Sequence, residues 1–109
     1  MGLVYAGRYT ETFRNRLGEK PYLQQTSKIR SKCEMILEQP YKACKSEPLK
    51  HMFAGKRSAR LDECYRIIYT VCEECRKQGH QETNLADCPN CIDVPIQTVT
   101  FLDITDHYR

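Results

Sequence analysis

Residues 47–71 read EPLKHMFAGKRSARLDECYRIIYTV, and this stretch decides the fold of the chain. It begins with an acidic residue, continues through a run of cations, and ends in aromatic and β-branched residues, which favour strands. Strands are predicted over residues 58–61 and 65–71, with a tight turn near Asp62 and Glu63 between them. The stretch therefore predicts a β-hairpin.

The second of these strands carries an arginine among strand-forming residues. Side chains alternate between the two faces of a strand, so Tyr65 and Ile67 are expected on one face and Arg66 on the other. Such an arginine either lies along the surface with its head in water or holds an anion, and its planar fork suits phosphate. A solvated surface explains most runs of charge. It accounts well for Lys42 and Lys45, and less well for Arg66.

The N-terminal half predicts a short strand followed by two helices. Residues 3–8 are apolar and aromatic with one glycine, as expected of a strand. Residues 9–17 place apolar side chains at intervals of four, the spacing of one helix face. A second helix is predicted between Pro21 and Pro40, and its Cys33 is better explained as a small buried hydrophobe than as a nucleophile. Nothing in this half is typical of a catalytic site.

The last strand is predicted over residues 96–104. Strict alternation would place three of its residues on one face, namely Val99, Phe101 and Asp103, with Thr98, Thr100 and Leu102 on the other. The order of elements is then one strand, two helices and three strands. This order predicts an α+β fold in which an N-terminal helical hairpin covers a small, antiparallel-rich sheet.

The length and composition are those of one domain, over residues 1–109. No apolar run approaches the roughly 20 residues that span a bilayer, and the N-terminus does not resemble a secretory signal. We therefore expect a cytoplasmic protein without a membrane partner. The formal net charge of +3 is a weak indication of nucleic-acid binding, so local charge has to carry that argument.

The cysteine pattern predicts one structural zinc ion. Seven cysteines in a chain without an export signal favour metal binding over a disulfide framework. Cys72 and Cys75 form one C-x-x-C pair, Cys88 and Cys91 form a second, and two such pairs complete a tetrahedral shell of four sulfurs. A shell with four protein ligands has no open position, so the metal is expected to be structural and not catalytic. Residues 72–91 would form an insertion between the last two strands.

The insertion has two possible roles, to staple a long loop or to contact RNA or the ribosome. Its cations Arg76 and Lys77 are offset by acids on both sides, so it carries no basic surplus, and the staple is favoured. His80 could replace one cysteine ligand, but a histidine in an exposed loop is the more common case.

Several segments resemble the RelE/ParE toxin superfamily. Taken singly, Glu47 is typical of an exposed loop acid, and the terminal His-Tyr of an ordinary chain end. Together, EPLKH at 47–51, GKRSARL at 55–61, YRIIYTV at 65–71 and HYR at 107–109 are most similar to the YoeB-like branch of messenger-RNA endonucleases. The resemblance covers the chain after residue 47 outside the cysteine insertion, and the helical hairpin agrees in layout only.

The resemblance implies roles for four residues in a metal-independent cleavage of RNA. Glu47 would act as the general base on a ribose 2′-hydroxyl, and Arg66 would hold the phosphate. His107 would protonate the leaving 5′-oxygen, and Tyr108 would position the RNA. The expected products are a 2′,3′-cyclic phosphate and a 5′-hydroxyl. Further RNA contacts are implied for three cations: Lys50, Arg57 and Arg60.

The resemblance also implies partners and rival functions. The implied partners are messenger RNA in the A site of the 70S ribosome and a cognate antitoxin that holds the toxin inactive. Typical members of the family are shorter, lack the cysteine insertion and end without Arg109. The rival functions are a ParE-like inhibitor of DNA gyrase and a non-catalytic, zinc-stapled binding module. ParE-like chains generally lack the acid and the terminal His-Tyr, so Glu47, His107 and Tyr108 favour the nuclease.

Overall fold

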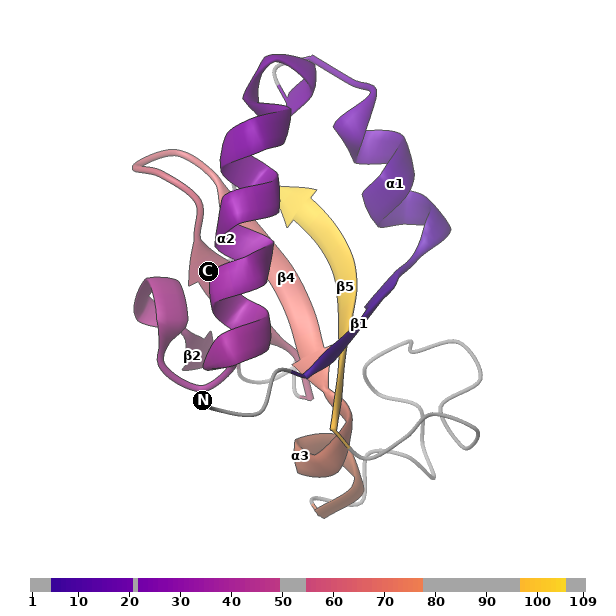
Figure 1. Cartoon of the computed structure of the whole chain (residues 1–109), viewed down its shortest axis with the longest axis vertical. Coiled ribbons are helices and arrows are strands. Elements are labelled where there is room, and N and C mark those ends of the chain that lie inside the picture. Colours follow the sequence, from indigo (N-terminus) through magenta and orange to yellow (C-terminus); the bar gives the residue numbers. More distant parts are fainter. Residues whose placement is uncertain (1–4, 21, 50–54, 78–96, 106–109) are drawn as a thin grey trace.

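The computed structural model of the chain describes residues 5–20, 22–49, 55–77 and 97–105, without the side chains of residues 75–77. It shows two layers, a five-stranded sheet and a pair of helices packed on one of its faces (Figure 1). This arrangement confirms the α+β fold that the sequence predicts. In the described part of the chain, no helix has the length and apolarity to cross a membrane.

The sheet has the strand order β1-β5-β4-β3-β2. Its strands are β1 (Ala6–Tyr9), β2 (Glu47–Pro48), β3 (Arg57–Arg60), β4 (Arg66–Val71) and β5 (Thr98–Thr105). Only β1 and β5 pair in parallel; the other described neighbours are antiparallel. The predicted hairpin is therefore formed by β3 and β4, and β5 joins it to the opening strand.

Each helix begins where a polar residue or a turn allows it. Helix α1 (Glu11–Leu17) is capped by Thr10, whose side chain accepts a hydrogen bond from the Phe13 amide at 3.2 Å. A 3-10 turn, Tyr22–Gln25, precedes helix α2 (Thr26–Glu38), so the second helix starts later than the sequence predicts. The short helix α3 (Cys72–Lys77) continues directly from β4.

The core lies between the two long helices and the sheet. Phe13, Ile29 and Ile36 from the helices are buried against Tyr69 and Phe101 of the sheet. Cys33 belongs to the same core, as the sequence predicts for a small buried hydrophobe. Burial raises its pKa to about 12, so the thiol is neutral at physiological pH and does not supply a thiolate nucleophile.

One prediction about β5 was wrong. Asp103 was expected on the same face as Phe101, but the ladder has a bulge: Ile68 pairs with Asp103, whereas Tyr69 pairs with Phe101. The extra residue shifts the alternation, so Ile104 enters the core in place of Asp103. The Asp103 carboxylate accepts a hydrogen bond from Nε of Arg16 at 2.9 Å and ties α1 to β5.

Candidate functional site

Two arginines lie directly opposite each other on adjacent strands. Arg60 of β3 pairs with Arg66 of β4, and Arg66 also pairs with Thr105 at the end of β5. The neighbouring pair, Ala59 and Ile67, is buried in the core under the helices. Because successive residues alternate between the faces, Arg60 and Arg66 project from the face opposite the helices.

This arginine pair has no counter-charge among the residues that the structure describes. Like charges on directly opposed residues of a sheet destabilise it. Among the described residues, neither Arg60 nor Arg66 forms an ion pair or a side-chain hydrogen bond, and Arg60 is exposed. Two adjacent guanidinium groups present forked donors that suit the oxygens of a phosphate. The pair therefore places two cations side by side without a counter-charge among the described residues.

Glu47 lies on the same face as the two arginines. It pairs with Ser58, which is two residues before Arg60 on β3 and so shares its face. From the spacing of strands and of residues along them, the Cα atoms of Glu47 and Arg66 are about 12 Å apart. The carboxylate is exposed. This separation leaves room for a phosphodiester between the ends of the two side chains.

Three of the predicted site residues lie outside the described part of the chain: Lys50, His107 and Tyr108. The structure therefore brings together Glu47, Arg60 and Arg66 from the predicted set. Strand β5 ends at Thr105, opposite Arg66, so the described chain leaves the sheet beside the arginine pair.

Arg57 lies on the other face of β3. It pairs with Tyr69 of the core and is only 7% exposed. Its Nη1 donates to Glu74 at 2.8 Å and its Nε donates to the Ser46 hydroxyl at 2.9 Å, while its guanidinium lies 5.1 Å from the centre of the Tyr41 ring. An RNA contact by Arg57 would require this ion pair to open. The structure thus separates Arg57 from the arginine pair with which the sequence groups it.

The predicted metal ligands are only partly within the described residues. Cys72 is buried at the start of α3. The side chain of Cys75 and the whole of Cys88 and Cys91 lie outside the described part. Cys72 and Cys75 are three residues apart on a helix, a spacing that makes side chains neighbours and suits two ligands of one ion. Within the described ranges no group of three or more ligand side chains gathers, so the zinc site remains a prediction.

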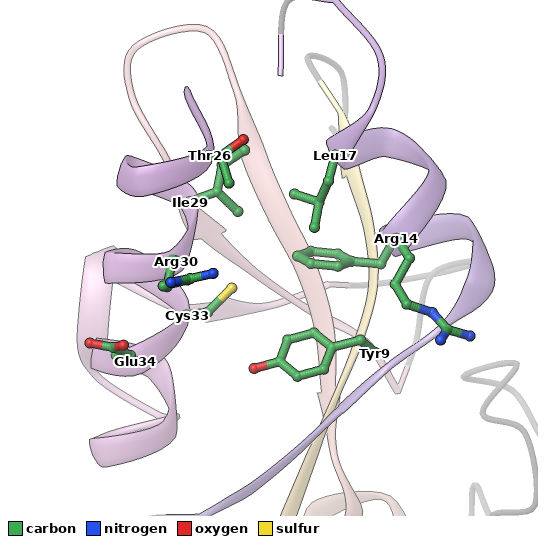
Figure 2. Close-up of a pocket in the computed structure, with 9 residues that line it drawn as sticks. Tyr9, Arg14, Leu17, Thr26, Ile29, Arg30, Cys33 and Glu34 are labelled. Atoms are coloured by element: carbon green, nitrogen blue, oxygen red, sulfur yellow. The ribbon is translucent and has the colours of Figure 1, made fainter. Parts of the chain in front are cut away.

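A separate cavity of about 570 Å³ opens between α1 and α2 (Figure 2). Tyr9 and Leu17 line one wall, and Ile29, Arg30 and Cys33 of α2 line the other. These residues cover the face of the sheet opposite to Arg60 and Arg66. Desolvation of Tyr9 raises the pKa of its phenol, and the Cys33 thiol is neutral as well, so the cavity offers no activated nucleophile.

Sequence reasoning missed Ser58, Ser46 and Glu74. The Ser58 hydroxyl is buried beside the Glu47 backbone and has no hydrogen-bond partner in the described part of the chain. Ser46 and Glu74 support Arg57. Strand alternation could have indicated Ser58, but no spacing in the sequence joins Ser46 to Glu74.

The sequence matches no protein-family model and no curated protein. The fold is similar to three solved toxin structures. The RelBE2 toxin–antitoxin complex from Mycobacterium tuberculosis has a TM-score of 0.63 at 21% identity, over 96% of this chain and 100% of that chain. A YoeB/ParE toxin from Agrobacterium tumefaciens has a TM-score of 0.64 at 18% identity, over 94% and 99% of the two chains. The YoeB–YefM complex from Staphylococcus aureus has 0.61 at 14% identity, over 97% and 100%. At these identities the similarity establishes the fold.

Proposed function

We propose that this chain is the toxin of a toxin–antitoxin system and cleaves messenger RNA in the ribosomal A site. The observation that carries the proposal is the directly opposed pair of Arg60 and Arg66, which has no ion-pair partner among the described residues and lies on the same sheet face as Glu47. The similarity of the fold to solved toxins agrees with it.

The cost of the arginine pair supports a phosphate ligand. Two opposed guanidinium groups repel each other in the free protein, and a bound phosphate would relieve that repulsion. Because the negative charge on the phosphate oxygens grows during the reaction, the same cations stabilise the transition state more than the ground state. Arg66 is assigned the reacting phosphate, and Arg60 and Lys50 are assigned supporting contacts.

The proposed reaction needs no metal. Glu47 removes the proton from the ribose 2′-hydroxyl, and the 2′-oxygen attacks the adjacent phosphorus. The bond from phosphorus to the 5′-oxygen breaks, and that oxygen takes a proton from His107. The products are a 2′,3′-cyclic phosphate and a 5′-hydroxyl. Tyr108 is assigned to the positioning of the RNA by stacking or hydrogen bonding.

Chain connectivity supports the assignment of His107. Thr105 lies opposite Arg66, and two residues of extended chain span at most about 7 Å. His107 follows Thr105 by two positions in the sequence, and the proposal assigns to it the proton that the leaving 5′-oxygen takes. A base and an acid on opposite sides of the phosphate are what an in-line displacement requires.

The proposal extends to a protein partner and a metal. Two of the similar structures are complexes of a toxin with an antitoxin, and we assign a cognate antitoxin to this chain. Four cysteines, Cys72, Cys75, Cys88 and Cys91, are assigned one zinc ion. When bound, a zinc with four thiolate ligands would stabilise the fold and would not take part in the cleavage.

Primer extension on messenger RNA translated in vitro tests the function. The chain is expected to cut at codon-registered positions only when ribosomes are present. The variants Glu47→Ala and Arg66→Ala should greatly reduce the rate of cutting and leave only a residual rate. Arg30→Ala, which changes an exposed arginine on the helical layer, is the control and should cut like the unchanged protein.

The other outcomes separate the alternatives. Cuts on naked RNA would keep the nuclease and remove the ribosome from the mechanism. If no cuts appear, a DNA supercoiling assay with gyrase distinguishes a gyrase inhibitor from a binding module. Full growth inhibition by the Glu47→Ala variant would exclude the nuclease as the cause of toxicity.

A further inference from the structure

The Arg57 side chain joins three segments that are distant in sequence. It reaches Glu74 in α3 and Ser46 before β2, and its guanidinium lies over the ring of Tyr41. A third donor, Nη2, points to the Tyr41 carbonyl at 3.5 Å. Because the guanidinium is buried and its donors are engaged, its position is fixed by the protein on several sides.

Ser46 is the residue immediately before Glu47. Its hydroxyl accepts the hydrogen bond from Arg57, donates to the Pro40 carbonyl at 3.1 Å and contacts the Tyr69 hydroxyl. Burial raises the pKa of Tyr69, so its phenol stays protonated and donates to the same Pro40 carbonyl at 2.5 Å. These contacts fix the point at which the chain enters β2.

The entry into β2 needs such support. Cys44 and Lys45 have φ angles of 54° and 56°, in the left-handed region that is costly for residues other than glycine. Strand β2 has only two residues and lies at the edge of the sheet. Among the described residues, the Glu47 carboxylate has no hydrogen-bond partner of its own. The backbone around Ser46 therefore decides where this carboxylate lies.

Glu74 comes from the start of the cysteine insertion. Helix α3 (Figure 1) begins at Cys72, and both of its glutamates form hydrogen bonds with residues of other segments. Glu74 binds Arg57, and Glu73 accepts hydrogen bonds from the hydroxyls of Tyr5 and Tyr41, the latter at 3.2 Å. Both residues between the first two cysteines are thus used to attach α3 to the sheet.

We infer that Arg57 is a positioning residue for Glu47, and that Glu74 of the insertion holds Arg57 in place for this task. The path runs from Glu74 through Arg57 and Ser46 to Glu47 by contacts of 2.8 Å and 2.9 Å and one peptide bond. This inference deepens the proposed nuclease function and rests on it. It gives the cysteine insertion a role in the chemistry without a direct contact to RNA.

Steady-state cleavage kinetics of the Glu74→Gln and Arg57→Lys variants test the inference. Both variants keep a polar side chain of similar size but weaken the contact between the two groups. We expect kcat to fall by about ten- to a hundredfold, the scale of a catalytic group displaced by about 1 Å, with KM changed by less than about twofold. The control is Arg16→Gln, which breaks another ion pair, to Asp103 at 2.9 Å, and should keep its kcat.

A second background distinguishes positioning from general destabilisation. In protein that already carries Glu47→Ala, the change Glu74→Gln should have no further effect on the residual rate, because the group that it positions is gone. An equal loss of rate in both backgrounds would show that Glu74 acts through the fold as a whole, and would overturn the inference.

Hydrogen exchange tests the same inference without cleavage. The Leu49 amide donates to the Lys56 carbonyl at 2.9 Å and reports on the attachment of β2 to β3. Glu74→Gln should speed exchange of this amide by about tenfold or more, while Arg16→Gln should leave it unchanged. Unchanged exchange in Glu74→Gln would overturn the positioning role. If the unchanged protein cuts no RNA, the nuclease proposal fails, and the exchange result still decides whether Glu74 holds β2.

Discussion

The two faces of β3 treat their arginines in opposite ways. On the helical face, Arg57 is buried and neutralised by Glu74. On the face opposite the helices, Arg60 lies directly across from Arg66, and neither has an ion-pair partner among the described residues. Two arginines three residues apart, in the sequence RSAR, therefore meet different electrostatic environments.

The different surroundings of Arg57 and Arg60 indicate which of these charges is connected with function. A buried ion pair such as that of Arg57 and Glu74 needs no external ligand, because each charge neutralises the other. The repulsion between Arg60 and Arg66 costs free energy in the isolated chain, and no described group offsets that cost. The proposed phosphate ligand would offset this cost, so substitutions on the two faces should separate stability from activity.

The largest effect is expected on the helical face. Arg57→Ala leaves the Glu74 carboxylate partly buried without a counter-charge, which should lower the free energy of unfolding by about 3–5 kcal/mol. Urea denaturation measures this loss. In the double variant Arg57→Ala/Glu74→Ala the loss should be smaller than the sum of the two single losses. Additive losses would show that the two side chains do not interact.

On the face opposite the helices, substitution of Arg66 should change activity and not stability. Arg66→Ala is expected to reduce kcat by about 10²–10³-fold, the usual loss when a donor to the reacting oxygen is removed. Its free energy of unfolding should stay the same or rise slightly, because the repulsion from Arg60 is removed. A large loss of stability in this variant would contradict the expected repulsion between Arg60 and Arg66.

The fold could be predicted largely from local patterns. Alternation in residues 65–71 and the four-residue spacing of residues 9–17 indicate which side chains meet between the sheet and the helices, and the structure agrees for Phe13, Ile67 and Tyr69. The pattern failed at Asp103, because a bulge adds one residue to β5 and no turn residue in the sequence marks it.

The site was less accessible to sequence reasoning. Charge alone groups Arg57 with Arg60, although residues three apart on a strand point to opposite faces. Alternation could therefore have separated them. The contact between Arg57 and Glu74 could not have been predicted, because it depends on the docking of α3 against β3, and tertiary packing of this kind has no local sequence signal.

A smaller loss of activity is expected from substitution of Arg60, the other arginine on the face opposite the helices. Arg60→Ala removes a supporting phosphate contact but leaves Arg66 in place, so kcat/KM should fall by about tenfold, close to the contribution of one charge-assisted hydrogen bond. Titration of cleavage at increasing salt provides the measurement. The variant should lose less rate than the unchanged protein as salt rises, since it makes one phosphate contact fewer. An unchanged salt dependence would remove Arg60 from the RNA-binding surface.

The smallest effect concerns the turn that sets Arg60 opposite Arg66. The Asp62 carboxylate accepts hydrogen bonds from the amides of Cys64 and Tyr65 at 2.8 Å and 2.9 Å. Desolvation alone would raise the pKa of Asp62, but these two bonds and the nearby Lys28 ammonium outweigh it and hold the pKa below its ordinary value of 3.8. The carboxylate is thus more stable ionised in the folded chain than in the unfolded one.

The sign of this shift fixes the pH dependence of Asp62→Asn. A depressed pKa contributes stability that is present above the ordinary value of 3.8 and is lost as the pH falls through the folded value. At pH 7 the variant should be less stable by about 1 kcal/mol, the contribution of a typical hydrogen bond. The difference should shrink as the pH falls below 3.8. Urea denaturation of both proteins across this range measures it. A difference that persists unchanged in acid would mean that the turn depends on the shape of the side chain and not on its charge. In that case, the opposed placement of Arg60 and Arg66 would not depend on the ionisation of Asp62.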